Sequence, residues 1–169
     1  NGEVNIYSKS GQGTRIQITL PLRIATENQL HPSDKAREHK FDLTGIHVLL
    51  VEDNELNAEI AMEVLKNKEV LVTWVPDGCA CVKEIQDKAA GTYQFILMDV
   101  QMPRMNGYEA TRKIRQMADA QKAQIPIVAM TANAFEEDRK HALDAGMDGF
   151  ITKPFRVDEM MKVIGKVMG

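Results

Sequence analysis

The sequence predicts an α/β fold in which a parallel sheet of five strands is covered by helices on both faces. Apolar runs bounded by polar residues occur at 48–51, 95–98 and 127–130, and a shorter one follows at 150–152. Such runs are typical of strands buried on both faces of a sheet. Segments with helical spacing separate these runs. This alternation implies right-handed crossovers and a doubly wound sandwich.

The first two strand–helix pairs lie between Gly45 and Lys88. Four apolar residues at helical spacing follow the first strand: Leu56, Ile60, Val64 and Leu65. A second strand is expected over 70–75 and a second helix over 78–88. The switch from continuous apolar runs to a period near 3.6 residues separates the strands from the helices.

Three further pairs complete the predicted sheet. After the third strand, a loop with Pro103 and Gly107 precedes a helix. Asn133 is a good N-cap for the next helix, which Gly146 closes. The last helix is expected over 157–168. The compact domain is therefore expected to cover residues 45–169.

The N-terminal residues have a different character. Residues 1–22 are expected to hold a β-hairpin, because apolar and polar residues alternate on both sides of a glycine-containing turn. Residues 23–44 are polar and charged with little periodicity, which is typical of a linker. A lone hairpin is marginally stable in water. We therefore expect it to be the end of a larger domain.

The composition excludes several classes of function. The 169 residues are 44% hydrophobic and 27% charged, with a net charge of −3. This mild acidity gives no basis for nucleic-acid binding, and no apolar stretch reaches the roughly 20 residues that span a bilayer. Cys79 and Cys81 lie on one predicted helix and point to different faces, so they cannot pair. A reducing, cytoplasmic setting without direct membrane contact is expected.

Reactive side chains follow the predicted strands. Glu52 and Asp53 follow the first strand, Asp99 ends the third, Thr131 ends the fourth and Lys153 follows the fifth. Ligands of parallel sheets bind beyond these carboxyl ends. The charges sum to −2, which a divalent ion would neutralise, and oxygen ligands favour Mg²⁺ or Mn²⁺. This set is suited to phosphoryl transfer with Asp99 as nucleophile. Alternatively, Glu52 and Asp53 only cap the first helix.

These motifs resemble the receiver domains of two-component signalling over residues 45–168. The resemblance rests on five segments: Val51–Asn54, Leu97–Pro103, Met105–Gly107, Met130–Asn133 and Lys153–Phe155. It implies a flavodoxin-like, CheY-like (βα)5 three-layer sandwich with strand order 2-1-3-4-5. It also makes a cis peptide bond between Lys153 and Pro154 an expectation.

The resemblance assigns roles to individual residues. It implies that Asp99 is the phosphoacceptor. Asp53, Asp99 and the backbone carbonyl of Gln101 would bind Mg²⁺ directly, and Glu52 would bind it through water.

The resemblance extends to the groups that sense the phosphoryl group. Lys153 would pair with it, and Thr131 would donate a hydrogen bond to it. Thr131 and Phe150 would form the switch, without a hydroxyl group on the aromatic ring. The first helix and the loops around the site would dock partners.

The first 22 residues resemble the closing hairpin of the ATP-binding domain of histidine kinases. The order of hairpin, linker and receiver is similar to that of a hybrid sensor kinase, whose phosphohistidine would be the donor. A histidine phosphotransfer domain would be the onward acceptor. No nucleotide-binding motif is present, so this chain would catalyse only the phosphorylation and dephosphorylation of its own aspartate. The oligomeric state stays open.

Three other functions compete with this interpretation. A haloacid-dehalogenase-like phosphatase also uses a strand-end aspartate, but Gln101 replaces the general acid of that family. A flavodoxin-like binding module would have to hold a phosphate against clustered carboxylates. A docking domain that works without phosphorylation is the third alternative.

Overall fold

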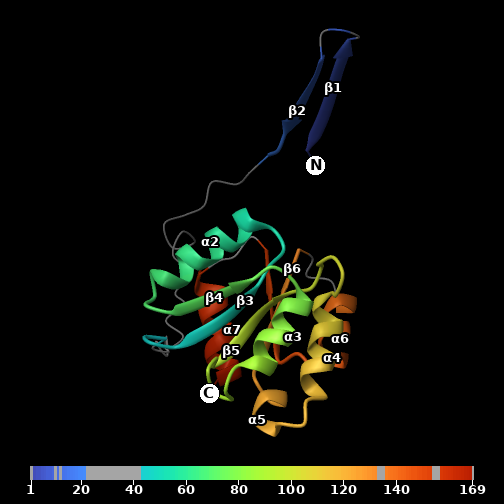
Figure 1. Ribbon diagram of the computed structural model, residues 1–169. Coiled ribbons are helices and arrows are strands. Elements are labelled where there is room, and N and C mark those ends of the chain that lie inside the picture. Colours follow the sequence, from blue (N-terminus) through green and yellow to red (C-terminus); the bar gives the residue numbers. More distant parts are fainter. Residues whose placement is uncertain are drawn as a thin grey trace. The chain divides into compact units, whose positions relative to one another are not determined.

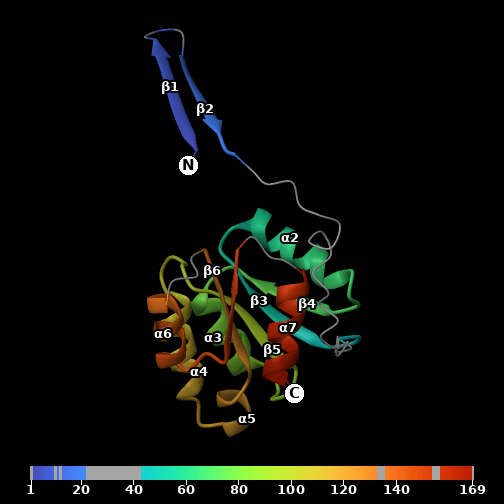
Figure 2. The same cartoon turned by 180° about the vertical axis from the view of Figure 1, so that it is seen from behind.

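The computed structural model describes residues 2–9, 11, 13–21, 43–132, 136–153 and 157–168 (Figures 1 and 2). The chain divides into two units, residues 1–40 and 41–169, and each is described by itself. The predicted cap Asn133, the Pro154 peptide bond and linker residues 23–42 lie outside the described residues.

The first unit contains the predicted hairpin. Strands β1 (Glu3–Lys9) and β2 (Gly13–Thr19) pair antiparallel, with Val4 opposite Ile18 and Ile6 opposite Ile16. Because opposite residues point to the same side, these four apolar side chains share one face of the hairpin. All are more than half exposed. Within the described residues, this face therefore has nothing packed against it.

The second unit is built on a parallel sheet of five strands, in the order β4-β3-β5-β6-β7. The strands are β3 (His47–Val51), β4 (Leu71–Val75), β5 (Phe95–Asp99), β6 (Ile127–Thr131) and β7 (Gly149–Thr152). Counted within this sheet, the order is 2-1-3-4-5, as expected. The three central strands β3, β5 and β6 are almost wholly buried. Their continuous apolar runs follow from this burial on both faces.

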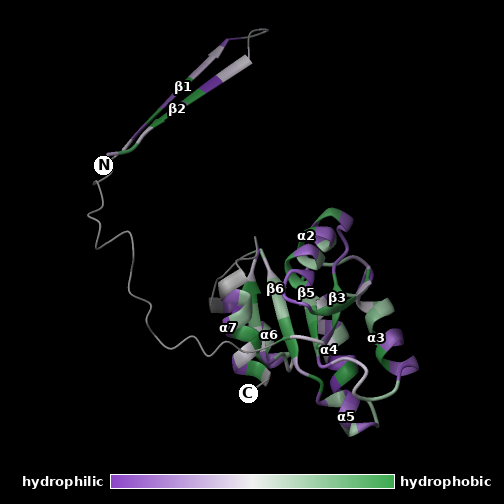
Figure 3. Cartoon of the chain, turned by 90° about the vertical axis from the view of Figure 1, so that its left-hand side faces the viewer, coloured by the Kyte–Doolittle hydropathy of each residue, from purple (hydrophilic) through white to green (hydrophobic). Residues whose placement is uncertain are grey.

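Helices cover both faces of the sheet (Figures 1 and 2). They are α2 (Glu55–Lys66), α3 (Gly78–Asp87), α4 (Gly107–Arg115), α5 (Ala120–Ala123), α6 (Glu136–Asp144) and α7 (Val157–Met168). One core joins α2 and α7 to the sheet, and the other joins α3, α4 and α6 to its opposite face. Hydrophilic and hydrophobic residues mix along the helices, as amphipathic packing requires (Figure 3). Among the described residues, none of the helices has both the length and the apolar character needed to cross a membrane.

Capping side chains fix where several helices begin. Asn54, Asp77 and Asp119 each accept a hydrogen bond from a backbone N–H in the first turn of α2, α3 and α5. In α4, Asn106 and Glu109 form a reciprocal capping box. The caps of α2, α3 and α4 place these helix starts directly after the loops at the carboxyl ends of the strands.

Several details differ from the sequence prediction. The short helix α5 was not predicted, because one turn of helix carries no periodic signal. In α2, Ala58, Ala61 and Leu65 face the sheet, whereas Leu56 and Ile60 are exposed.

Other differences are at the ends of elements. The second helix ends at Asp87, one residue earlier than predicted. The predicted linker ends at Thr44, yet Leu43 is buried in the core, so the compact unit begins before Gly45. The second strand begins at Leu71, one residue later than predicted.

Arg115 connects several segments near the amino ends of the strands. Its guanidinium group donates to the backbone carbonyls of Gly146, Ala123 and Ile125 and pairs with Asp148 at 2.8 Å. The same Asp148 oxygen accepts the N–H of Ile127, the first residue of β6. A single side chain thus joins α4, the α5 turn and the loop before β7.

Replacing Arg115 with alanine is expected to lower the free energy of unfolding by about 2–4 kcal/mol. The substitution removes a donor from three carbonyls and the ion-pair partner of Asp148. Urea denaturation measures the loss. Arg112→Ala is the matched control, because Arg112 is an exposed arginine on the same helix; its effect should stay within about 0.5 kcal/mol. Equal losses in the two variants would contradict the connecting role of Arg115.

Candidate functional site

The carboxyl ends of four strands bring the predicted site residues to one edge of the sheet. Glu52 and Asp53 follow β3, Asp99 ends β5, Thr131 ends β6 and Lys153 follows β7. Because the strands are parallel and β3, β5, β6 and β7 lie in this order in the sheet, all five residues lie at the same edge. The predicted convergence of strand ends is therefore confirmed.

Three carboxylates lie close enough to share one metal ion. Oxygen atoms of Glu52, Asp53 and Asp99 lie within 4.8 Å of one another. Glu52 and Asp99 are buried, with 1% and 5% of their surface exposed, whereas Asp53 is exposed. Clustered, partly buried carboxylates repel one another and favour a bound cation. All three offer oxygen donors, so the residues present fit Mg²⁺ or Mn²⁺.

Lys153 joins two of these carboxylates. Its Nζ atom lies 2.5 Å from Glu52 Oε2 and 2.7 Å from Asp99 Oδ2. Burial by itself lowers the pKa of Lys153, but its hydrogen bonds to Asp99 and Glu52 outweigh burial and raise this pKa above its ordinary value. Lys153 is therefore positively charged at neutral pH and balances part of the negative charge of the site.

Burial dominates the ionisation of Asp99. It raises the pKa of the Asp99 carboxyl above its ordinary value, and the hydrogen bond from Lys153 lowers it only in part. The negative charge of Glu52 adds to the increase, while the N–H of Gln101, 3.1 Å from Asp99 Oδ1, opposes it. This last bond places the backbone of Gln101 beside the carboxylate. The role of its carbonyl as a metal ligand stays a prediction.

Two further residues hold Glu52 in place, and sequence reasoning missed both. Asn57 Nδ2 donates to Glu52 Oε1 at 3.0 Å, and the indole N–H of Trp74 donates to the Glu52 backbone carbonyl at 2.9 Å. Asn57 lies three residues after the cap Asn54, so the start of α2 directs its side chain back to the site. That spacing was the signal in the sequence, whereas nothing local marked Trp74.

Thr131 and Phe150 lie on neighbouring strands. Thr131 is buried at the end of β6. Phe150 in β7 pairs with Ala129, which lies two residues before Thr131 in β6. Alternation along the strands therefore places the two side chains on the same face of the sheet. The guanidinium carbon of Arg139 lies 4.4 Å from the centre of the Phe150 ring, within range of a cation–π interaction. The switch role of this pair stays a prediction.

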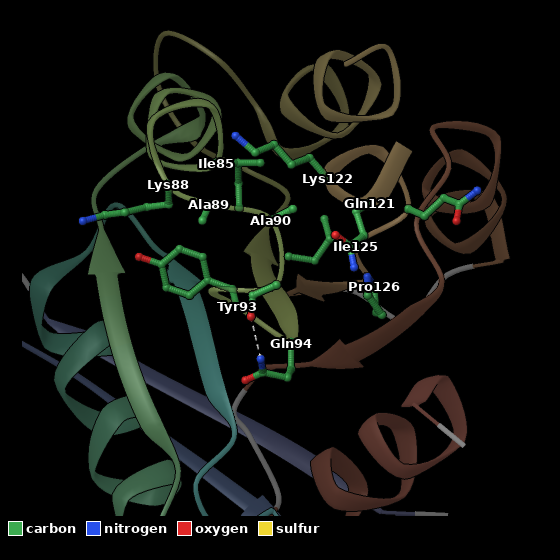
Figure 4. A pocket seen from close by; sticks show the side chains of 12 residues that line it. Ile85, Lys88, Ala89, Ala90, Tyr93, Gln94, Gln121, Lys122, Ile125 and Pro126 are labelled. Atoms are coloured by element: carbon green, nitrogen blue, oxygen red, sulfur yellow. Dashed lines mark hydrogen bonds between the residues drawn. The ribbon is translucent and has the colours of Figure 1, made fainter. Parts of the chain in front are cut away.

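A pocket of about 270 Å³ lies at the opposite edge of the sheet (Figure 4). Its lining residues precede β5 and β6 and include Tyr93, Gln94, Ile125 and Pro126, with Lys88 and Lys122 at its rim. It contains none of the predicted site residues. The candidate site at the carboxyl ends of the strands is therefore separate from this pocket.

Asp99→Asn is expected to stabilise the domain at neutral pH. Since folding raises the pKa of Asp99, the native state binds more protons than the unfolded chain, and stability falls as the pH rises through that pKa. The amide carries no such penalty, so the melting temperature at pH 7 should rise. The gain should shrink as the pH approaches the ordinary value of 3.8.

Thermal unfolding at a series of pH values measures this effect. Glu59→Gln, which removes an exposed carboxylate on α2, is the matched control and should show little change. A difference between Asp99→Asn and the original chain that does not depend on pH would contradict the expectation.

Comparison with known proteins agrees with this geometry. The family described as the response regulator receiver domain matches residues 48–165. An autoinducer 2 sensor kinase/phosphatase LuxQ from Vibrio vulnificus is 35% identical over 160 residues, which is 94% of this chain and 18% of that protein. Hybrid signal transduction histidine kinase L from Dictyostelium discoideum is 38% identical over 122 residues, 70% of this chain and 7% of that protein. The chain thus spans less than a fifth of these relatives.

Solved structures show the same similarity. The receiver domain of a sensor histidine kinase from Pseudomonas aeruginosa, described with a magnesium ion in its active site cleft, has 37% identity and a TM-score of 0.66. The match covers 75% of this chain and 99% of that domain. A second match is a co-crystal structure from Saccharomyces cerevisiae that contains the histidine phosphotransfer protein Ypd1 and the receiver domain of Ssk1. This match has 28% identity and a TM-score of 0.62, and it covers 74% of this chain and 88% of the matched chain. With strand-end carboxylates, a bridging lysine and a family match over most of its length, the chain belongs to the response regulator receiver domain family.

Proposed function

We propose that residues 45–169 accept a phosphoryl group on Asp99 in a phosphorelay, with Mg²⁺ or Mn²⁺ bound beside it. The observation that carries the proposal is the position of Asp99, which bonds to Lys153 at 2.7 Å while Glu52 and Asp53 lie within 4.8 Å. An isolated strand-end aspartate would need neither a cation nor two further acids beside it.

The reaction is a transfer from a phosphohistidine nitrogen to a carboxylate oxygen. An oxygen of Asp99 attacks phosphorus, the P–N bond breaks, and the imidazole leaves with the electron pair. Asp53, Asp99 and the Gln101 carbonyl would hold the metal directly, and Glu52 through water. When bound, the ion neutralises charge on the phosphoryl oxygens.

Lys153 supplies the second positive charge of the reaction. It already contacts Asp99, so a small movement away from Glu52 lets its ammonium group pair with a phosphoryl oxygen. Thr131 would then donate its hydroxyl hydrogen to the same group. Phe150 would change position with Thr131, at the expense of its contact with Arg139.

We further propose that α2 docks the partners, namely the phosphohistidine domain of a kinase and a histidine phosphotransfer domain. Leu56 and Ile60 are 64% and 51% exposed on the outside of α2, which begins two residues after Asp53. Glu59, Glu63 and Lys66 border this apolar surface. The yeast receiver that is similar in structure was crystallised with a phosphotransfer protein, which supports such a partner.

The first unit supports a parent protein of the hybrid-kinase type. We propose that its hairpin is the end of a histidine-kinase ATP-binding domain and that a linker joins it to the receiver, which includes the buried Leu43. The exposed apolar face of the hairpin and the alignment with a sensor kinase over 94% of this chain support this assignment. Such a receiver would work in the cytoplasm, where kinases of this type obtain their phosphoryl groups.

Acetyl phosphate with Mg²⁺ is expected to label the chain with one phosphoryl group. Intact-protein mass spectrometry measures the added mass, and chelation of the metal should prevent it. Asp99→Ala should abolish labelling because it removes the nucleophile.

Three outcomes would contradict the phosphoacceptor assignment. These are labelling that persists in Asp99→Ala, labelling without metal, and steady turnover of a phosphomonoester. The last would indicate a phosphatase.

Leu56→Glu is expected to slow transfer between Asp99 and a histidine phosphotransfer protein at least about tenfold. A charge placed at the centre of an apolar docking surface costs more than the roughly 1.4 kcal/mol that this factor represents. Labelling by acetyl phosphate should remain, since this small donor needs no docking surface.

Leu143→Glu is the matched control for this prediction. Leu143 has nearly the same exposure, 63%, but lies on α6 against the other face of the sheet. Equal slowing by the two variants would rule out α2 as the specific docking surface.

A further inference from the structure

A buried carboxylate lies outside the proposed metal site. Asp77 is 2% exposed, and its Oδ1 atom caps α3 by accepting the N–H of Ala80 at 2.9 Å. Its Oδ2 atom forms an ion pair with the guanidinium group of Arg104. A buried carboxylate needs a cation or several donors to remain charged. A helix cap alone does not require a charged partner. The ion pair with Arg104 is therefore a separate contact of this buried carboxylate.

The backbone of Arg104 is strained. Its φ angle is +66°, a region that side chains other than glycine rarely adopt. The N–H of Met105 donates to the carbonyl of Pro103 at 2.8 Å, so Arg104 is the central residue of a γ-turn with positive φ. Strain of this kind persists only where the surroundings enforce it. The ion pair with Asp77 is a contact that can enforce it.

The turn belongs to the loop that borders the site. This loop runs from Asp99 to Gly107, whose N–H closes it by donating to the Val100 carbonyl at 3.0 Å. Gln101, three residues before Arg104, donates its N–H to Asp99 Oδ1. Any shift of the γ-turn therefore acts on the backbone beside the phosphoacceptor.

The loop is also held from two sides by close approaches of glycine. A Cβ atom on Gly78 would lie 2.6 Å from the Met105 carbonyl, and one on Gly107 would lie 2.3 Å from the Asp99 carbonyl. The loop thus lies directly against the start of α3, where Asp77 is located.

We propose that Arg104 is a positioning residue that sets the metal ligand in the loop. Through its ion pair with Asp77, it holds the γ-turn, and the γ-turn holds the backbone of Gln101, whose carbonyl would bind the ion. The inference rests on the metal site of the proposed function and assigns a new role to residues that do not touch the ion.

Mn²⁺ titration of the full chain, followed by the EPR signal of the free ion, tests the proposal. Arg104→Ala should weaken Mn²⁺ binding by about tenfold, the loss typical when a supporting contact of a metal ligand is removed. Arg104→Gly should weaken it equally although it relieves the strain, because it too lacks the ion pair. Arg104→Lys should restore most of the affinity, since the pair uses one guanidinium nitrogen.

Asp77→Asn keeps the cap but not the charge, so it should match Arg104→Ala. The double variant should bind no more weakly than either single one, because both remove the same contact. Arg112→Ala, which removes an exposed positive charge from α4, is the matched control and should leave affinity unchanged. Melting temperatures measured in parallel confirm that every variant is folded during the titration.

The outcomes separate this inference from the proposed function. If the original chain binds no Mn²⁺, the metal site itself is wrong. If the original chain binds Mn²⁺ and Arg104→Ala binds it equally well, the site stands and the positioning role is overturned. A loss in Arg104→Ala that Arg112→Ala reproduces would also overturn it, because the effect would then not depend on the ion pair with Asp77.

Discussion

The ammonium group of Lys153 is the contact on which the site depends. It bonds to Glu52 and Asp99, which lie 101 and 54 residues away in the sequence. These partners follow β3 and end β5, whereas Lys153 follows β7. The contact can form only when β6 has been placed between β5 and β7, so the site requires β3, β5, β6 and β7 to be in place. Conversely, the ion pairs tie the edge strand β7 to the centre of the sheet.

Much of this arrangement could be predicted because parallel strands place their ends together. The apolar runs before Glu52, Asp99, Thr131 and Lys153 located the site without any structure. The strand order came from the family resemblance, since alternation alone leaves several orders open. Asn57, Trp74 and Arg104 were not predicted as part of the site, because their contacts depend on side-chain direction or on a neighbouring strand. The helical period placed Leu56 and Ile60 on the inner face of α2, but they are exposed, and the smaller Ala58 and Ala61 face the sheet instead.

The two edges of the sheet are stabilised in different ways. At the amino ends, Arg115 donates to three carbonyls and pairs with a carboxylate, so polar groups are well satisfied. At the carboxyl ends, acids are concentrated, Asp99 is desolvated and Arg104 has a positive φ angle. Repulsion between carboxylates and the cost of burying Asp99 are thus found where chemistry is proposed, and Lys153 offsets them only in part. Such a division lets one edge change without loss of the fold.

Trp74 gives the molecule a built-in optical sensor. It is the single tryptophan of the chain, and its indole group donates to the backbone carbonyl of Glu52, next to Asp53. The emission of an indole group depends on the polarity and charge around it. A cation arriving between the carboxylates would alter the electric field at that ring. Ligand occupancy could therefore be followed by intrinsic fluorescence, with no dye attached and no residue replaced.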